Sequence, residues 1–293
     1  MPDTRLYHLM VAGVGITIQT PQPLTVTDGF APFLTDAVRP DYLVEYRENP
    51  DLPQPEGTPL YRSESYEVYP DGAGGFVRWY FDGMDGFVRF ARVTEDRLSG
   101  RVLAEYLPRK RELVSVIGNC FAFSGWESLL IRKNRLCFHA ACVDTELGGI
   151  LFSGPSGIGK STQADLWQRC RDARLINGDR PILSRDQTGW LAWGSPYAGS
   201  SRCHVNDCCP VSAVVMLRQA PACRLRRLEL PEGFRSIYAG MTMYSWNREF
   251  VSTAVDLAMA LASEVPVLEF ECTPERCAVD FLERELREVI AYE

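Results

Sequence analysis

GPSGIGKST, the stretch from Gly154 to Thr162, follows the pattern G-x-x-x-x-G-K-[ST] of loops that hold phosphate groups. Glycines let the backbone curl so that several N–H groups converge on an anion without Cβ clashes. A helix that begins near Lys160 would point its positive dipole end at the same anion. The pattern predicts that Lys160 reaches the β- and γ-phosphates of a nucleotide and that the Ser161 hydroxyl binds Mg²⁺. The predicted nucleotide-binding residues are Gly154, Ser156, Gly157, Ile158, Gly159, Lys160, Ser161 and Thr162.

The residues on either side supply the structural context that this pattern requires. GILFS, residues 149–153, is a short apolar run that is typical of a buried strand. Residues 161–171 place apolar side chains at helical spacing, among them Leu166 and Trp167. The sequence therefore predicts a strand, a glycine-rich loop and a helix, in that order.

Length and composition restrict the class of protein. A composition of 46% hydrophobic and 24% charged residues is typical of a soluble globular protein, and a length of 293 residues predicts two domains or one domain with a large extension. No apolar run is long enough to span a membrane, and the first residues lack the layout of a signal peptide, so we expect a cytoplasmic protein. A net charge of −7 argues against nucleic acids and anionic membranes as partners.

The chain changes character near Lys110. Strand-like runs separated by glycine and aspartate turns fill the preceding part, for example residues 41–46 and 75–81. Residues 110–133 instead carry a helical apolar face. We therefore expect a β-rich domain over residues 1–109 and an α/β nucleotide-binding domain with a mixed sheet over residues 110–293.

The ten cysteines are expected to be reduced thiols, because none of them forms a C-x-x-C pair and no secretion signal is visible. The cluster Cys203-His204 with Cys208-Cys209 has enough soft ligands for zinc. Adjacent cysteines rarely bind one ion comfortably, and cysteine is among the most frequently buried residues. Buried thiols are the preferred interpretation.

His139 is a candidate catalytic residue because of its place in a predicted hairpin. Residues 136–143 form a predicted strand, and a turn centred near Glu146 joins it to the strand before the glycine loop. In such a hairpin His139 lies opposite Ser153, at the mouth of the loop. The alternative is a buried histidine whose ring is satisfied by a backbone carbonyl. The predicted position next to the phosphates favours a functional role.

Two further residues are candidates for the same site. Asp179 follows the apolar strand at residues 173–177 and is placed to hold or orient Mg²⁺, although aspartate is also common in turns. Arg202 ends the loop of small residues that begins at Ser195, a loop able to approach a ligand closely. Arg202 either contacts a phosphate or belongs to an ordinary loop, and both interpretations remain open.

The run from His139 to Asp179 resembles the catalytic domain of HPr kinase/phosphorylase and its relatives, within the phosphoenolpyruvate carboxykinase-like fold. The shared layout is a strand with histidine, a turn, a strand, the motif G-x-S-G-x-G-K-S, a helix, and a strand that ends in acidic residues. The first 109 residues, the loop from Ser195 to Arg202 and the strand at Val265-Pro266-Val267 are similar to an uncharacterised bacterial branch of this group.

The resemblance implies a mixed α/β core and ATP-dependent phosphorylation of a hydroxyl. His139 matches a histidine that assists catalysis, and Asp179 matches the second of two adjacent aspartates, which supply a base and a metal ligand. Gly178 stands where the first aspartate would be. His139 or Asp179 must then act as the base, or the activity is reduced or lost. Nothing in the sequence marks the HPr protein as the substrate.

Three hypotheses follow. The first is an ATP- and Mg²⁺-dependent kinase with His139, Asp179 and Lys160 as catalytic residues, Ser161 and Asp179 as metal ligands, and a small molecule or peptide as acceptor. The second, motivated by Gly178, is a regulatory nucleotide-binding module without phosphate transfer. The third is a carboxykinase-type lyase, which three histidines and three lysines make difficult to build. Assembly into a homo-oligomer is compatible with each of them.

Overall fold

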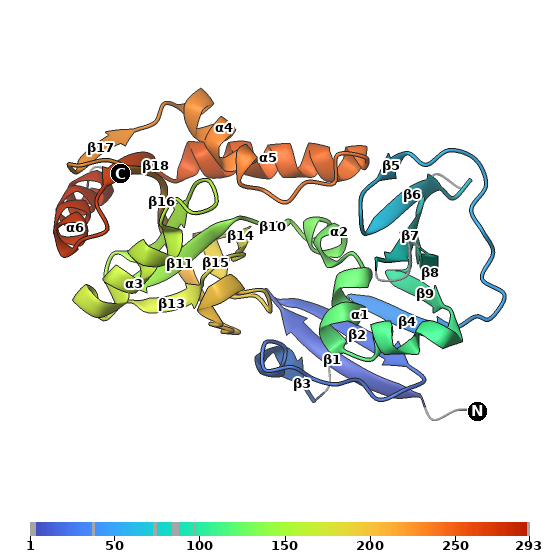
Figure 1. Ribbon diagram of the computed structural model, residues 1–293. Coiled ribbons are helices and arrows are strands. Elements are labelled where there is room, and N and C mark those ends of the chain that lie inside the picture. The colour runs from blue at the N-terminus through green and yellow to red at the C-terminus, as the bar shows by residue number, and fades with distance from the viewer. Residues whose placement is uncertain (1–3, 37–38, 73–74, 84–87, 97, 292–293) are drawn as a thin grey trace. The chain divides into compact units, whose positions relative to one another are not determined.

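The computed structural model describes residues 4–36, 39–72, 75–83, 88–96 and 98–291 (Figure 1). Its contacts divide the chain into two units, residues 1–129 and 130–293. Each unit contains a mixed β-sheet with helices, so the protein is of the α/β class. The division falls later than the predicted boundary at Lys110, because the residues after Lys110 pack within the first unit. The Tyr46 hydroxyl, for example, donates to the Cys120 carbonyl over 2.6 Å.

The strands of the first unit follow the order β3-β1-β2-β4-β9-β8-β7-β6-β5. β1 and β2 form a hairpin that turns at Ala12 and Gly13, both with positive φ, so the stretch from Tyr7 to Ile18 is two strands. β4 runs parallel to both β2 and β9, which makes the sheet mixed. The bounds are β1 Arg5–Val11, β2 Val14–Thr20, β3 Leu34–Thr35, β4 Tyr42–Glu48, β5 Tyr61–Arg62, β6 Tyr66–Pro70, β7 Phe76–Asp82, β8 Val88–Asp96 and β9 Arg101–Tyr106.

The helical segment predicted over residues 110–133 is broken into short pieces. Gly125 lies between two of them at φ 70°, a left-handed conformation that glycine takes freely. A Cβ at this position would also collide with the Arg78 guanidinium, so the chain turns here instead of continuing the helix. The helical pieces of this unit are η1 Ala31–Phe33, η2 Pro108–Val114, α1 Ile117–Phe123 and α2 Trp126–Ile131, the last of which spans the division.

The second unit is built on a sheet that forks at β16. The main order is β10-β14-β15-β16-β12-β11-β13, and β18 also pairs with β16 and carries β17 on its other edge. The first residues of β16 pair antiparallel with β15, and its last six pair parallel with β18. The bounds are β10 Arg135–Cys137, β11 Ala140–Thr145, β12 Gly148–Ser153, β13 Arg174–Asn177, β14 Ile182–Asp186, β15 Gly189–Trp193, β16 Cys208–Gln219, β17 Arg224–Arg227 and β18 Val267–Cys272.

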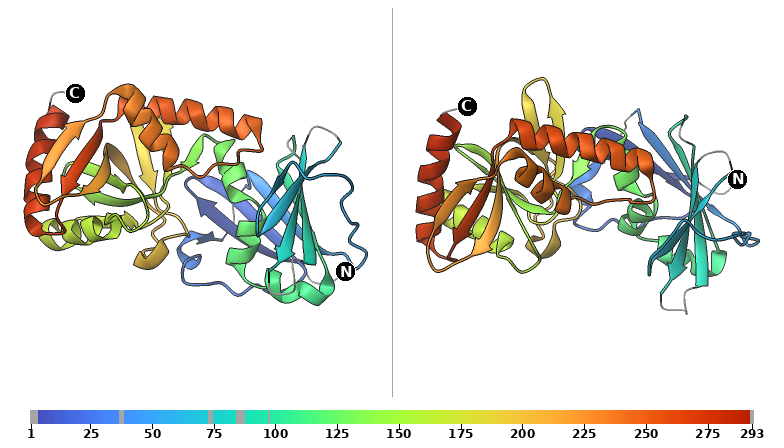
Figure 2. Two further views of the ribbon diagram at one scale, coloured as in Figure 1. Left: turned by 45° about the horizontal axis from the view of Figure 1, so that its top comes forward. Right: turned by 90° about the horizontal axis from the view of Figure 1, so that it is seen from above.

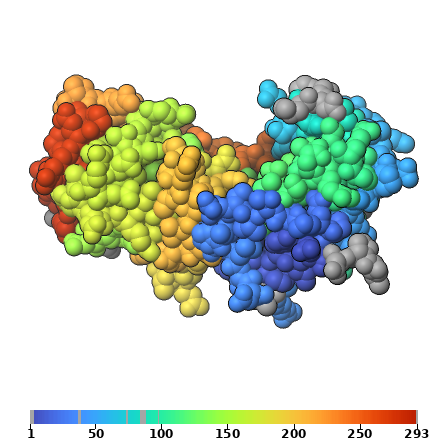
Figure 3. Space-filling view, turned by 60° about the horizontal axis from the view of Figure 1, so that its bottom comes forward, coloured from blue at the N-terminus to red at the C-terminus, as the bar shows by residue number. Residues whose placement is uncertain are grey.

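Helices cover both faces of this sheet (Figure 2). Because strand side chains alternate, Leu151 joins a core with α5 on one face, and Phe152 joins a core with α3 and α6 on the other. Trp167 of α3 is 1% exposed and packs near the Phe152 ring. α3 and α6, yellow-green and red, lie side by side on the surface in Figure 3. The helices are α3 Lys160–Arg171, α4 Leu230–Ala239, α5 Arg248–Glu264 and α6 Arg276–Ala291, with η3 at Gly199–Ser201.

Several elements differ from the prediction. The sequence from Phe234 to Ala262 predicts a mostly helical region, and the structure has two helices there, separated at Gly240, where a Cβ would lie 2.6 Å from the Phe138 ring. Thr273 is a candidate helix cap in the sequence, with Pro274 at the first helical position, but α6 begins at Arg276, so both residues precede it. β14 and β17 were not predicted. No helix among the described residues combines the length and the apolar character needed to cross a bilayer.

Candidate functional site

The glycine loop has the structural context that its sequence predicts. β12 ends at Ser153, and α3 begins at Lys160 after residues 154–159. Gly154, Gly157 and Gly159 have φ angles of 140°, 78° and 115°, which side chains rarely tolerate. Three of the glycines are therefore required by the path of the backbone. The predicted order of strand, loop and helix is confirmed.

The N-terminus of α3 is open. Its N-cap residue is Gly159, which has no side chain to accept from the first N–H groups, and the first turn contains no acidic residue. Ser161 and Thr162 are exposed in that turn, and within the described residues their side chains form no hydrogen bond. The orphan N–H groups and the helix dipole together favour an anion at this point.

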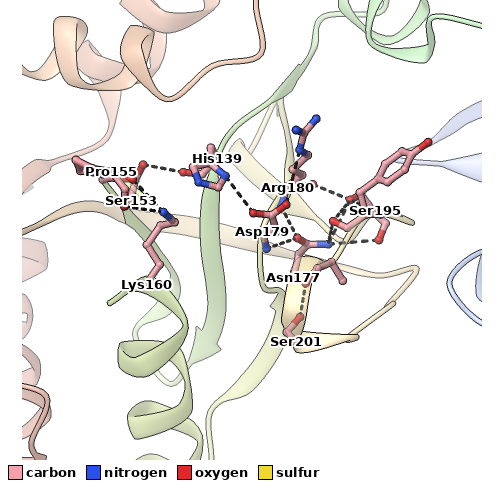
Figure 4. A network of polar contacts seen from close by, with 12 residues as sticks. His139, Ser153, Pro155, Lys160, Asn177, Asp179, Arg180, Ser195 and Ser201 are labelled. Atoms are coloured by element: carbon pink, nitrogen blue, oxygen red, sulfur yellow. Dashed lines mark hydrogen bonds and ion pairs between the residues drawn. The ribbon is translucent and has the colours of Figure 1, made fainter. Parts of the chain in front are cut away.

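Lys160 is a cation held inside the loop. It is 8% exposed, and Nζ donates to the carbonyls of Gly154 and Pro155 over 3.0 and 3.1 Å (Figure 4). Burial lowers the pKa of Lys160 below its ordinary value, which the negative charge of Asp179 partly opposes. No carboxylate of the described chain contacts this ammonium group. A phosphate would supply the missing negative charge, so the loop and Lys160 fit the group that the motif predicts.

His139 lies in a break between two strands. The strand predicted over residues 136–143 is interrupted after Cys137, because the His139 N–H donates to Gly240 over 2.7 Å and not to a neighbouring strand. Ala140, one residue later than predicted, is paired with Ser153. The Ser153 hydroxyl still donates to the His139 carbonyl over 2.8 Å, so the histidine remains at the mouth of the loop.

His139 and Asp179 form a pair. Nδ1 of His139 is 3.1 Å from Oδ1 of Asp179, and their side chains are 42% and 30% exposed. Figure 4 shows His139 between the glycine-loop residues and Asp179. If Nδ1 carries the proton, Nε2 is left as the free acceptor of the imidazole ring. Asp179 Oδ2 is 3.7 Å from Arg180 Nε, so the carboxylate also has a cationic neighbour on its other side.

Asn177 holds the turn that carries Asp179. Its Oδ1 accepts from the N–H groups of Asp179 and Arg180 over 2.9 and 2.7 Å, and the residue is fully buried. Its Nδ2 donates to Ser195 and Tyr197, and the Ser195 hydroxyl donates to the Arg180 carbonyl over 2.7 Å. Asn177 was not predicted as a site residue, although an asparagine two residues before an aspartate at a strand end is typical of an Asx turn.

The loop from Ser195 to Arg202 approaches Asp179 as its small residues suggest. A Cβ on Gly199 would lie 2.8 Å from the Asp179 Cβ, and a Cβ on Gly178 would lie 2.5 Å from the Ser201 Cβ. Arg202 follows η3 in a left-handed conformation with φ 51°. Its side chain is exposed and has no hydrogen-bond or ion-pair partner in the part of the chain that the structure describes. The structure therefore does not place Arg202 in contact with the other candidates.

Two cavities formed by described residues adjoin the glycine loop. The histidine-side cavity, of about 530 Å³, is bordered by His139, by Ser153 to Ser156, and by residues of α4, β16, β17 and β18. The helix-side cavity, of about 500 Å³, is bordered by Gly157 to Gly159, by the first turn of α3, and by the last residues of β16 and β18 with those that follow them. The loop therefore contacts one space next to His139 and another next to the start of α3.

The expected burial of the clustered cysteines is confirmed only for Cys209, whereas Cys203 and Cys208 are half-buried. Sγ of Cys142 and Sγ of Cys209 are 3.8 Å apart in the core, and this contact together with burial raises the pKa of Cys142. Cys203 Sγ is within hydrogen-bonding distance of the Leu175 carbonyl. Among the described residues, no group of three or more His, Cys, Asp or Glu side chains is arranged to hold a metal ion. Mg²⁺ commonly keeps several waters and needs only one or two protein oxygens beside phosphates, which Ser161 and Asp179 could supply.

Comparison with known proteins gives only distant likenesses, all of them among solved structures. No family model and no curated protein matches the chain. Among solved structures, the chain is similar to the HPr(Ser) kinase/phosphatase from Coxiella burnetii, at 17% identity and a TM-score of 0.33, over 53% of this chain and 92% of that one. A likeness of this strength is a distant structural resemblance and does not establish a shared activity.

Proposed function

We propose that the protein is an ATP- and Mg²⁺-dependent kinase that transfers the γ-phosphate to a hydroxyl group. The observation that carries the proposal is the His139–Asp179 pair at the mouth of a glycine loop that already holds a buried lysine. Phosphoryl transfer asks a protein mainly for positioning and for neutralisation of charge. Both are available in this arrangement.

The phosphates of ATP would occupy the glycine loop. Backbone N–H groups of residues 156–161 and the Lys160 ammonium would hold the phosphate oxygens, and Ser161 with Asp179 would hold Mg²⁺, which neutralises charge on the phosphates. The helix-side cavity suits the nucleoside, because apolar side chains and amide groups lie together there. It is lined by Ile158, Leu217, Gln163, Gln219, Thr273 and Pro274.

His139 would accept the proton of the acceptor hydroxyl. Its Nδ1 faces Asp179, so Nε2 is the nitrogen available to take that proton as the hydroxyl oxygen bonds to the γ-phosphorus. The bond between the γ-phosphorus and its bridging oxygen breaks, and ADP leaves with that electron pair. Asp179 orients the imidazole and stabilises the imidazolium, in the way that a carboxylate supports a catalytic histidine elsewhere.

Transfer from γ-labelled ATP and the affinity for ATP together test this proposal. His139→Ala should leave ATP affinity unchanged and lower transfer by about 100- to 10,000-fold, because general-base catalysis is lost. Lys160→Ala should weaken ATP binding by about 10- to 100-fold, since charged hydrogen bonds to phosphate are removed. His8→Ala, in the first unit, is the matched control and should change neither quantity. Unchanged ATP affinity in Lys160→Ala would contradict the phosphate loop itself.

A regulatory nucleotide-binding module without transfer is the second candidate. Gly178 favours it, because a side chain at this position would collide with Ser201, so the structure has no room for a second acid beside Asp179. ATP binding that depends on Lys160, with no labelled product from any acceptor in a metabolite and peptide pool, would support this alternative. A labelled acceptor that requires His139 would exclude it.

A further inference from the structure

The histidine-side cavity is enclosed by elements that lie apart in the sequence. Its walls are the glycine loop with His139, the helix α4, and the strands β16, β17 and β18. Its volume of about 530 Å³ is in the range of sites for small molecules. Met216 and Leu228 add apolar surface on which a carbon skeleton can rest.

The charged side chains that line this cavity carry a net positive charge. Arg218, Arg226 and Arg235 line it together with the carboxylates of Glu232 and Glu269. Arg226 donates to Glu232 over 2.8 Å and to Glu269 over 3.2 Å, and Arg218 Nε is 2.6 Å from Glu269. Both carboxylates are therefore paired with the first two arginines, and the three arginines leave one positive charge in excess.

Arg235 carries that excess charge. It lies on α4 and lines the cavity. Within the described residues its guanidinium makes no hydrogen bond and no ion pair, although its charge contributes, after Arg226, to lowering the pKa of the nearby Glu232. Arginine presents a planar fork of donors that matches carboxylate and phosphate oxygens. A bound anion would complete the set of pairs in this cavity, whereas a cation would face the unpaired guanidinium.

We propose that the histidine-side cavity is the acceptor site and that it binds a small hydroxylated molecule carrying a carboxylate or phosphate group, with Arg235 as the partner of that group. This inference rests on the proposed kinase function. The anion is held at α4 while the hydroxyl lies at His139, on the border between the cavity and the glycine loop. The reaction is the transfer described above, and it needs no further reactant.

A matched series of three-carbon compounds tests the charge of the ligand. Glycerate carries a carboxylate, glycerol 3-phosphate a phosphate, glycerol no charge, and serinol a positive charge. Binding is measured by ligand-observed NMR on the whole protein saturated with Mg²⁺ and the non-hydrolysable ATP analogue AMP-PNP, so that the glycine loop is already filled. We expect at least one of the two anions to bind at least ten times more tightly than glycerol and serinol. Which anion binds distinguishes a carboxylate site from a phosphate-ester site.

Variants of two arginines assign the binding to this cavity. Arg235→Ala should weaken binding of the anion by at least fivefold without changing the affinity for AMP-PNP. Arg224→Ala is the control, because Arg224 is exposed on β17 but does not line the cavity. Arg235→Glu should abolish anion binding and favour serinol. Each variant changes an exposed residue, so folding should be retained.

The outcomes separate this proposal from the one on which it rests. Absence of AMP-PNP binding would contradict the kinase and the acceptor site together. Three results, each with normal AMP-PNP binding, would overturn the acceptor site alone. They are glycerol or serinol binding as tightly as the anions, no binding of either anion, and equal effects of Arg235→Ala and Arg224→Ala.

Discussion

Gly178 leaves no space for a side chain next to Asp179. A Cβ at this position would lie 2.5 Å from the Ser201 Cβ and 3.1 Å from the Ala198 carbonyl oxygen. We expect Gly178→Asp to lower the free energy of unfolding by about 1 to 3 kcal/mol, as overpacking does. Ser201→Gly should restore much of this loss in the double variant, which denaturant unfolding of all four proteins in a double-mutant cycle measures.

Gly83→Asp is the control for this prediction. No described residue lies within 4 Å of a Cβ at Gly83, so an aspartate there should change the free energy of unfolding by no more than about 0.5 kcal/mol. If Gly178→Asp were as stable as Gly83→Asp, the contact between residues 178 and 201 would not constrain this position. Packing would then not explain why glycine, and not aspartate, occupies position 178.

Residues whose neighbours are local could be predicted from the sequence. The loop around Lys160 is specified by adjacent glycines, and the structure has the expected strand before it and helix after it. Asn177 could not be assigned in this way, because its role depends on Ser195. The proposed role of Arg235 likewise depends on strands that lie elsewhere in the chain. Arg202 lies in the predicted loop, but no short-range pattern says where its side chain points.

α6 is tied to α3 by a cluster of charges. Arg171 of α3 contacts Glu283 over 2.5 Å and Asp280 over 2.7 Å, and Arg287 contacts Glu283 over 2.7 Å. The hydrogen bond from Arg171 is the main cause that lowers the pKa of Glu283 from its ordinary value of 4.5. A lowered carboxyl pKa means that the stabilisation is present above pH 4.5 and is lost as the pH falls through the lower pKa of the folded state.

Glu283→Gln should therefore destabilise the protein in a pH-dependent way. We expect a loss of about 0.5 to 1 kcal/mol at pH 7, the range for partly exposed ion pairs, and little difference from the unmodified protein near pH 3. Denaturant unfolding at both pH values measures the effect. Glu288→Gln on the same helix is the control, because Glu288 is exposed and has no partner among the described residues. A difference that persists unchanged at low pH would contradict the electrostatic origin.

At the scale of elements, prediction succeeded where periodicity is unbroken and failed where contacts interrupt it. The apolar patterns of residues 267–272 and 273–293 predict a strand and a helix, which the structure has as β18 and α6, apart from the start of the helix. The strand expected across His139 is broken because the chain changes partners from β14 to β12 at this residue. This change depends on residues far along the sequence, and it is also what places His139 at the loop.

For the whole molecule, the candidate site belongs to one unit. Every residue assigned to it lies within residues 130–293. We expect calorimetry to resolve two unfolding transitions, and ATP with Mg²⁺ to raise the temperature of only one of them. At a concentration of 100 times Kd the shift should be about 5 to 10 °C for a unit of this size. A single transition, or a shift in both, would contradict the division. Lys160→Ala should remove most of the shift at the same ATP concentration.

The last residues of β16 alternate between the two cavities beside the glycine loop. Met216 and Arg218 border the histidine-side cavity, and Leu217 and Gln219 border the helix-side cavity. β16 thus separates the proposed acceptor from the proposed nucleoside, and the glycine loop borders both cavities. Substitutions at residues 216 and 218 should affect binding of the proposed acceptor, and substitutions at residues 217 and 219 should affect binding of the proposed nucleoside. Selectivity for each substrate can then evolve separately within four consecutive residues.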